Sequence, residues 1–161
     1  MTTQDYNNCV DQHADGVYRF ILKNLKDEQD AQDVVQDAFE KLWINHRKLD
    51  SKKAKSYLFT TAYHTMIDHI RKYRNLCSIE DIPETSNDTF HDYSDLKEVL
   101  DEALEKLNDV QRSVILLRDY EGYSYQEIGE ITNLNESQVK VYIYRARLFL
   151  KNYIVSPEHV I

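Results

Sequence analysis

The spacing of apolar residues predicts that most of this chain is helical. Apolar positions recur every three or four residues, as in a helix that packs on one side, and alternation with a period of two is not seen. One such stripe runs from about residue 5 to residue 25, and another predicts a helix over about 30–45. Only three glycines and two prolines interrupt the 161 residues. The pattern therefore predicts an all-α protein.

A third helix is predicted over about 56–74, after a basic segment at 46–56 that has no clear apolar period and is expected to form a loop. Apolar and aromatic residues occur almost all round this helix, and a helix of that kind is normally buried. Lysines and arginines flank it, however, and rings interleaved with cations suit single-stranded nucleic acid, because bases stack on rings while cations follow the backbone. Core packing and nucleic-acid contact are equal alternatives on this composition.

The helical period is lost from residue 77 to residue 93, where the chain is polar and strongly acidic. This composition predicts a linker. Its acidity either keeps the segment extended and soluble or mimics nucleic acid in a basic groove. Two more helices are predicted after it, over 94–107 with Ser94 as cap and over 108–120 with Asn108 as cap.

The stretch from 122 to 147 carries the signals of two short helices joined by a tight turn. Ser124 with Glu127, and then Asn135 with Gln138, each form a capping box, in which two side chains satisfy free N–H groups at a helix start.

Asn133 lies between the two boxes, where the first helix must end in a left-handed residue, a conformation that asparagine tolerates. Gly129 leaves room for two helices to cross. These features predict a helix-turn-helix.

The second helix of this motif is expected to expose polar and basic side chains at Gln138, Lys140, Tyr142, Tyr144, Arg145 and Arg147. Arginine and glutamine can pair with base edges in the major groove, lysine can neutralise phosphate, and tyrosine can contact a thymine methyl or a sugar. The alternative is a helical hairpin with a solvated polar face. The caps, the turn residue, the small contact residue and the basic face together favour DNA binding.

The charge of the chain is distributed in blocks. Net charge is −8 overall, made up of −6 over 1–40, +7 over 41–76, −9 over 77–110 and zero over 111–161. Only one block suits a phosphate backbone, and the whole molecule would be repelled by bare DNA. This distribution favours delivery to DNA by a partner.

Several other classes of protein are disfavoured by what the chain lacks. Cys9 and Cys77 lie far apart, and no signal peptide is seen, so a reduced cytoplasmic protein is expected. The longest aliphatic run, at 114–117, is far too short to cross a bilayer, so no membrane insertion is expected.

Metal binding and enzymatic activity are also disfavoured. His64, Asp68 and His69 suggest a metal site only weakly, because a third convergent ligand is missing. No nucleophile–base pair or phosphate loop appears. We expect no metal, no cofactor and no enzymatic activity.

Three segments, in this order and at this spacing, resemble sigma factors of bacterial RNA polymerase, of the small extracytoplasmic-function (ECF) type. DAQDVVQDAFEKLW at 30–43 is similar to the core-polymerase-binding helix of that family, and KSYLFTTAYHTMIDHIRKYR at 55–74 is similar to its −10 element helix. LNDVQRSVILLRDYEGYSYQEIGEITNLNESQVKVYIYRAR at 107–147 is similar to its −35-binding domain.

The resemblance implies a division of the chain into two small helical domains, which are residues 1–76 and the helix-turn-helix domain 94–161, joined by the acidic linker 77–93. It also implies a specificity subunit that binds core polymerase, recognises the −35 and −10 elements and helps to open the duplex. The linker would run through the active-site cleft and RNA exit path of the polymerase. An anti-sigma factor is a further implied partner.

The resemblance assigns side chains to each partner. The coiled coil of the largest polymerase subunit would be bound by Asp33, Gln36, Asp37, Phe39 and Glu40. The −10 element, captured as a single strand, would be bound by Lys48, Lys52, Lys53, Tyr57, Tyr63, His64 and Arg71. The duplex −35 element would be bound by Gln138, Lys140, Val141, Tyr144, Arg145 and Arg147.

The sequence departs from the usual pattern of that family at three positions. Many relatives have tryptophan at the position of Tyr57, asparagine at that of His64 and arginine at that of Tyr142. A tyrosine can still stack on a base, so the first change is compatible with strand separation.

Two other functions compete with this interpretation. A helix-turn-helix regulator that binds DNA as a dimer needs a dimerisation surface and a ligand or receiver domain, and residues 1–76 resemble neither. A polymerase inhibitor that uses acidic segments as nucleic-acid mimics would leave the basic face at 138–147 unexplained.

Overall fold

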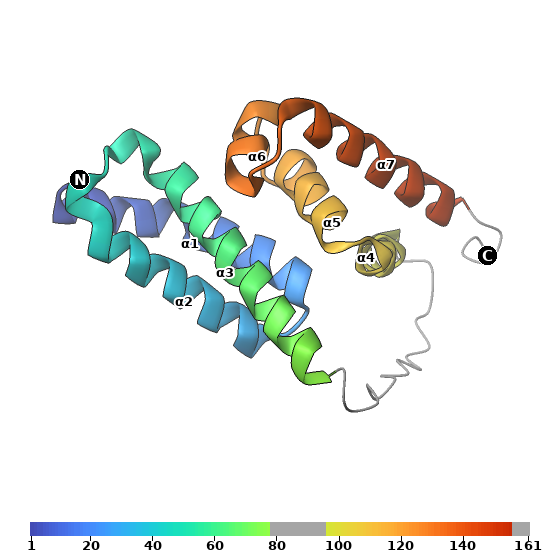
Figure 1. The fold of residues 1–161 in the computed structure, drawn as a ribbon, viewed down its shortest axis with the longest axis horizontal. Helices are drawn as coiled ribbons and strands as arrows, with labels where there is room; N and C mark the ends of the chain where they lie inside the picture. The colour runs from blue at the N-terminus through green and yellow to red at the C-terminus, as the bar shows by residue number, and fades with distance from the viewer. Residues whose placement is uncertain (78–95, 156–161) are drawn as a thin grey trace.

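The computed structural model describes residues 1–77, here called the first half, and residues 96–155, the second half (Figure 1). The first half contains α1 (Thr3–Leu25), α2 (Glu28–Asn45), the short 3-10 turns η1 (His46–Lys48) and η2 (Ser51–Lys53), and α3 (Ala54–Cys77). The second half contains α4 (Leu96–Lys106), α5 (Asp109–Ile115), the π-helical turn η3 (Leu116–Tyr120), α6 (Tyr125–Thr132) and α7 (Glu136–Ile154). The prediction of an all-α fold is confirmed. The predicted cap Ser94 and all but the first residue of the predicted linker lie outside the described residues.

The first two helices begin slightly earlier than predicted because side-chain oxygens cap them. The Asp5 N–H donates to Thr2 Oγ1 (3.0 Å) and the Thr2 N–H donates to Asp5 Oδ2 (2.9 Å), which starts α1 at Thr3. The Asp30 N–H donates to Asp27 Oδ1 (2.9 Å), which starts α2 at Glu28. Lys26, in the left-handed conformation with φ of 62°, turns the chain between the two helices.

The basic segment before α3 is more regular than predicted. It forms the turns η1 and η2 in place of a loop over 46–56, and α3 starts at Ala54 instead of at about 56. Asp50 stabilises η2, because its Oδ1 accepts a hydrogen bond from the Lys52 N–H (3.1 Å). The lysines of this segment therefore extend from a helical backbone.

Burial decides between core packing and nucleic-acid contact for most side chains of α3. Leu58, Phe59, Ala62, Tyr63 and Met66 of α3 are buried, where the helix packs against α1, α2 and, from the second half, α6. Most rings and aliphatic groups of α3 therefore stabilise the core, and nucleic-acid contact is left to the remaining face.

Trp43 follows the apolar spacing of α2, but it does not lie in the core of the first half. Its side chain is 44% exposed. The indole stacks on the ring of His46 at 4.3 Å between centroids and meets the edge of Tyr6 at 4.9 Å, at the rim of the helices and not between them.

A π-helical turn ends α5 in the second half, where an α-helix to residue 120 was predicted. The Glu121 N–H donates to the Leu116 carbonyl five residues back (3.1 Å), which widens the last turn. Gly122 then adopts a φ of 76°, a conformation that glycine enters without steric cost.

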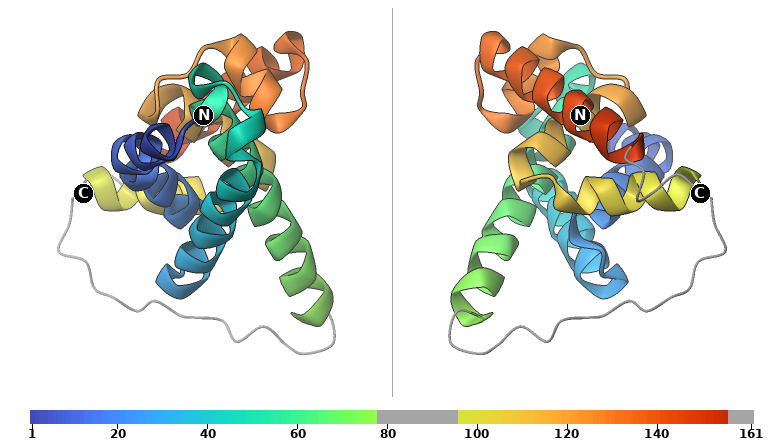
Figure 2. Two further views of the ribbon diagram at one scale, coloured as in Figure 1. Left: turned by 90° about the vertical axis from the view of Figure 1, so that its left-hand side faces the viewer. Right: turned by 90° about the vertical axis from the view of Figure 1, so that its right-hand side faces the viewer.

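The two halves pack against each other, with α6 beside α3 and α5 beside α1 (Figures 1 and 2). A buried polar contact joins them: Asn24 Oδ1 accepts from Arg112 Nε and from Ser113 Oγ, both at 3.2 Å. Away from this interface, α2 and α3 diverge toward the end of α3 (Figure 2). The domain boundaries stay a prediction, but the two helical groups share an interface that the sequence did not indicate.

Candidate nucleic-acid interface

The helix-turn-helix predicted over 122–147 is present in α6 and α7. Ser124 and Glu127 exchange two hydrogen bonds of 3.1 Å at the start of α6. Asn135 and Gln138 do the same at the start of α7, at 3.0 and 2.8 Å. Both predicted capping boxes are confirmed.

The turn between the two helices also has the predicted chemistry. Asn133 ends α6 in the left-handed conformation with φ of 61°. A Cβ atom on Gly129 would lie 2.6 Å from the Leu134 carbonyl oxygen, a distance that real Cβ atoms essentially never show. Glycine at 129 is therefore what lets the turn approach α6.

The two faces of α7 have opposite character. Val139, Ile143, Ala146 and Leu150, which recur at helical spacing, are buried. The other face exposes Gln138, Lys140, Val141, Tyr144, Arg145 and Arg147. Tyr142 was expected on that exposed face, but it is only half-exposed because it packs against the core.

Arg147 is held by an acidic residue from η3 that sequence reasoning missed. Its guanidinium donates to both carboxylate oxygens of Asp119, at 2.6 and 3.3 Å, and these hydrogen bonds raise the pKa of Arg147. Asp119 lies 28 residues before Arg147, in the π-helical turn. No local pattern indicates such a pairing.

A cluster of cations at the start of α6 was also missed. The ring of Tyr125 lies 4.4 Å from the Arg118 guanidinium and 5.6 Å from Lys140 Nζ. Arg118 further donates to the Tyr123 carbonyl (2.9 Å). The positive charge near the start of α7 is therefore larger than the residues of α7 alone supply. The one sequence signal for Arg118 was its position directly after the aliphatic run at 114–117.

Most residues predicted to bind the −10 element lie at or near the surface. Lys48, Lys52, Lys53, His64 and Arg71 are exposed. Tyr57 is half-buried, and its hydroxyl accepts from Asn45 Nδ2 (3.0 Å). These side chains come from η1, η2 and α3, so the fold brings them to neighbouring elements.

Tyr63 differs from the other −10 candidates because it is only 6% exposed. Burial raises the pKa of its phenol, and the nearby carboxylate of Asp109 raises it further. Asp109 belongs to α5, so the second half lies close to this side of α3. In this arrangement Tyr63 does not present a free ring to a DNA strand.

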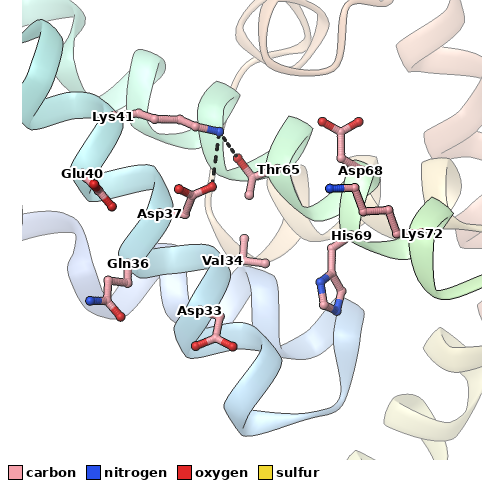
Figure 3. Close-up of a pocket in the computed structure, with 10 residues that line it drawn as sticks. All are labelled: Asp33, Val34, Gln36, Asp37, Glu40, Lys41, Thr65, Asp68, His69 and Lys72. Atoms are coloured by element: carbon pink, nitrogen blue, oxygen red, sulfur yellow. Dashed lines mark hydrogen bonds and ion pairs between the residues drawn. The ribbon is translucent and has the colours of Figure 1, made fainter.

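The predicted polymerase-binding stripe lines an open groove of about 500 Å³ between α2 and α3 (Figure 3). Its α2 side is formed by Asp33, Val34, Gln36, Asp37, Glu40 and Lys41, and its α3 side by Thr65, Asp68, His69 and Lys72. Lys41 Nζ spans the groove between Asp37 (3.3 Å) and the Thr65 hydroxyl (3.2 Å). The groove therefore presents mixed charge, with carboxylates at Asp33, Asp37, Glu40 and Asp68 and cations at Lys41 and Lys72.

Phe39 does not line this groove. It is half-buried against the core, and its carbonyl accepts from the Tyr6 hydroxyl (3.2 Å). Within residues 1–77 and 96–155 no three His, Cys, Asp or Glu side chains come together as metal ligands.

Comparison with known proteins places both halves in one family. The family model Sigma-70 region 2 matches residues 9–75, and Sigma-70, region 4 matches residues 97–150. The ECF RNA polymerase sigma factor SigM of Bacillus subtilis (strain 168) is 30% identical over 144 residues, which cover 86% of this chain and 88% of SigM. This chain belongs to the ECF RNA polymerase sigma factors. RNA polymerase sigma factor SigV of the same organism is also 30% identical, over 141 residues that cover 86% of this chain and 84% of SigV.

Solved structures support the fold of this sigma factor. It resembles the sigma factor RpoE in a complex with the anti-sigma factor NepR from Bartonella quintana, with a TM-score of 0.81, 22% identity and coverage of 96% of this chain and 99% of RpoE. It also resembles CnrH in a complex with the cytosolic domain of CnrY, with a TM-score of 0.71 and 22% identity. This match covers 95% of this chain and 89% of CnrH.

Family membership fixes the general role. ECF sigma factors act in promoter recognition and transcription initiation, and they are regulators of transcription and not enzymes. The region 2 match covers α2, η1, η2 and most of α1 and α3, and the region 4 match covers α5, α6 and most of α4 and α7. Among the helices described, none combines the length and apolarity needed to span a bilayer.

Proposed function

We propose that this sigma factor binds core RNA polymerase, recognises the −35 element as duplex and the −10 element as a single strand, and promotes opening of the DNA between them. Each task falls to a separate element. α7 would bind the −35 element, η1, η2 and α3 the −10 element, and α2 the polymerase.

The exposed face of α7 is the observation that carries this proposal. An α-helix fits the major groove of B-form DNA, and helix-turn-helix proteins place the start of their second helix against the base edges. Lys140, Val141, Tyr144 and Arg145 occupy that part of α7, while its opposite face anchors the helix in the core. This combination of rigid support and exposed hydrogen-bonding groups suits base recognition.

The −10 element would meet the lysines of η1 and η2 and the exposed side of α3. Cations follow a single-stranded backbone while rings stack on its bases. Tyr57, the half-buried ring next to these lysines, is the proposed stacking platform. Capture of unstacked bases there would favour the opened duplex.

Core polymerase would dock on the α2 side of the groove, through Asp33, Gln36, Asp37 and Glu40. Phe39 would support this helix from beneath and would not contact the partner directly. The net charge of −8 gives the polymerase a second role, since it would carry to DNA a chain that bare DNA repels. An anti-sigma factor is a further proposed partner, because one structural relative, RpoE, is held in a complex with the anti-sigma factor NepR.

A gel shift on a pool of promoter fragments, with and without core polymerase, tests the proposal. Specific retention only when both proteins are present is the expected result, and the retained fragments define the promoter sequence. Tight and specific retention by the sigma factor alone would point instead to a dimeric regulator. Polymerase binding without any DNA retention would point to an inhibitor.

A further inference from the structure

Charged side chains at the interface between the two halves follow a single rule. Four ion pairs join the halves, and in each one the cation belongs to the first half and the anion to the second: Arg19–Glu121 (3.0 Å), Lys23–Asp101 (3.7 Å), Lys26–Glu105 (3.5 Å) and Arg74–Asp109 (2.6 Å). Arg19, Lys23 and Lys26 are the only basic residues in positions 1–40. All the positive charge of α1 and of the turn after it is therefore directed at the second half.

A buried polar contact lies beside these ion pairs. Arg112 is 7% exposed, and besides Asn24 it donates to the Leu107 carbonyl (2.9 Å) and to Asp109 Oδ1 (2.6 Å). Asp109 thus joins Arg112 to Arg74 of α3. Because an unpaired buried polar group is costly, this contact specifies one relative placement of the halves.

The loop after η3 packs against α1 and α3. Tyr123 is 2% exposed, meets the edge of Phe59 at 5.1 Å between centroids and carries Lys55 Nζ 4.6 Å from its ring. The Glu121 carboxylate lies over Gly16, where a Cβ atom would be 3.3 Å from Oε2. The loop thus lies in close contact with α1 at Gly16.

One polar group at the same interface lacks a hydrogen bond. The Tyr123 hydroxyl is buried and has no hydrogen-bond partner among the described residues. An unmet hydrogen bond of this kind lowers the stability of the packed state. Ion pairs with exposed members add little, and salt screens them. The interface is therefore specific in geometry and modest in strength, which suits contacts that must separate.

The packed arrangement conflicts with simultaneous recognition of both promoter elements. Elements centred near −35 and −10 lie about 25 base pairs apart, which is about 85 Å of B-form duplex at 10–10.5 base pairs per turn of about 34–36 Å. A compact chain of this length has a radius of gyration of about 15 Å. With α6 held against α3, the two DNA-binding surfaces cannot reach sites that far apart.

We propose that the packed arrangement is an autoinhibited state of this sigma factor, held closed by the clasp of Arg19, Lys23, Lys26 and Arg74 on Glu121, Asp101, Glu105 and Asp109. This inference rests on the proposed function, because closure inhibits only a protein that must reach both elements. The carboxylates of the second half pair with cations of the first half. Among them, Asp109 pairs with Arg74 of the −10 helix and lies close to Tyr63. Binding of core polymerase would separate the halves. Closure leaves the −10 lysines exposed but keeps Tyr63 buried beside Asp109, so full contact with single-stranded −10 DNA needs the open form. In the free protein, the apparent affinity for this DNA is therefore lower, in proportion to the fraction of molecules that are open.

Charge reversal and charge exchange in the full-length protein test the clasp. Glu121→Arg and Arg19→Glu should each raise the radius of gyration in small-angle X-ray scattering, and the double variant Arg19→Glu/Glu121→Arg should restore the wild-type value. Lys23→Glu and Asp101→Lys form an independent pair for the same exchange. Circular dichroism confirms that each variant is folded.

Binding to a single-stranded −10 oligonucleotide without polymerase gives the functional readout. Glu121→Arg should bind roughly ten-fold more tightly than Glu130→Arg, a control that makes the same charge change at an exposed position of α6. Equal affinity of these two variants would overturn the inhibitory role. An unchanged radius of gyration in all single variants, or a double variant that stays expanded, would overturn the clasp. Neither scattering result depends on polymerase, so failure of the proposed function would appear separately, as loss of promoter retention by wild-type holoenzyme.

Discussion

Arg145 is the cation on α7 that is best placed to bind a base. Lys140 lies 3.5 Å from Glu136, and Arg147 is paired with Asp119, whereas Arg145 makes no ion pair within residues 1–77 and 96–155. An arginine that is exposed and unpaired can direct its guanidinium at a guanine edge, the commonest specific contact in the major groove. The different partners of these three cations therefore imply different roles: Arg145 for bases, and the paired residues for phosphate or for orientation.

Replacement of Arg145 by alanine is expected to weaken −35 recognition by about 1–3 kcal/mol if the side chain contacts a base. The measurement is holoenzyme binding to promoters with substitutions through the −35 element. Lys151→Ala, which removes one exposed positive charge from the last turn of the same helix, serves as the control. An unchanged promoter preference in Arg145→Ala would remove this residue from the site.

Two substitutions of Tyr57 distinguish ring stacking from hydrogen bonding in the −10 region. Tyr57→Ala should leave assembly with polymerase intact and impair strand opening, because the ring that stacks on an unpaired base is lost. Tyr57→Phe keeps the ring and loses only the hydrogen bond with Asn45, so it should open DNA nearly normally. Permanganate footprinting of the holoenzyme measures opening, and normal reactivity with the alanine variant would refute the stacking role.

Capping signals were the part of the molecule that sequence predicted best at the scale of elements. Both boxes and the left-handed Asn133 were predicted correctly, because each depends on side chains within four residues of the backbone groups that they satisfy. Burial of Tyr63, exposure of Trp43 and the pairing of Asp119 with Arg147 were not predicted. Each of these depends on which element packs nearby, and periodicity along one helix does not contain that information.

Gly129 is expected to stabilise the helix-turn-helix, because it lets the turn lie close to α6. Gly129→Ala should lower the free energy of unfolding by about 1–3 kcal/mol, because the added methyl group meets a backbone carbonyl that has no freedom to rotate away. Thermal denaturation of the full chain measures this change. Glu130→Ala, at the neighbouring exposed position of α6, should change stability little. Equal stability of the two variants would show that the turn relaxes freely.

The acidic side of α2 is expected to act as a unit in docking. Reversal of charge at Asp33 and Asp37 together should reduce affinity for core polymerase and leave the helical content unchanged, since Asp33 is exposed and Asp37 is half-exposed. Asp11→Lys together with Glu130→Lys makes the same charge change at exposed positions of α1 and α6 and serves as the control. Binding of the Asp33 and Asp37 variant to polymerase at wild-type strength would show that another surface docks.

The whole molecule differs most from its sequence-based description where the halves meet. Composition predicted two helical groups with an acidic segment between them, and that description contains no contact between the groups. The contact depends on Asn24 and Arg112, which lie 88 residues apart, and on charges whose pairing is not evident from blocks of net charge. Block charges do not indicate it, because Arg19, Lys23 and Lys26 belong to the block 1–40, whose net charge is −6.

Asn24 offers a test of that contact in the intact molecule. Asn24→Ala removes the acceptor shared by Arg112 and Ser113 and leaves two buried donors unpaired, so the free energy of unfolding should fall by about 1–3 kcal/mol. Urea denaturation measures this as a lower midpoint with an unchanged slope. Asn8→Ala, at an exposed position of the same helix, removes only a hydrogen bond with Gln4 and should change the midpoint little. If the two variants unfold at the same urea concentration, Asn24 is already solvated in solution and the halves are apart. If only Asn24→Ala lowers the midpoint, the free protein adopts the packed arrangement.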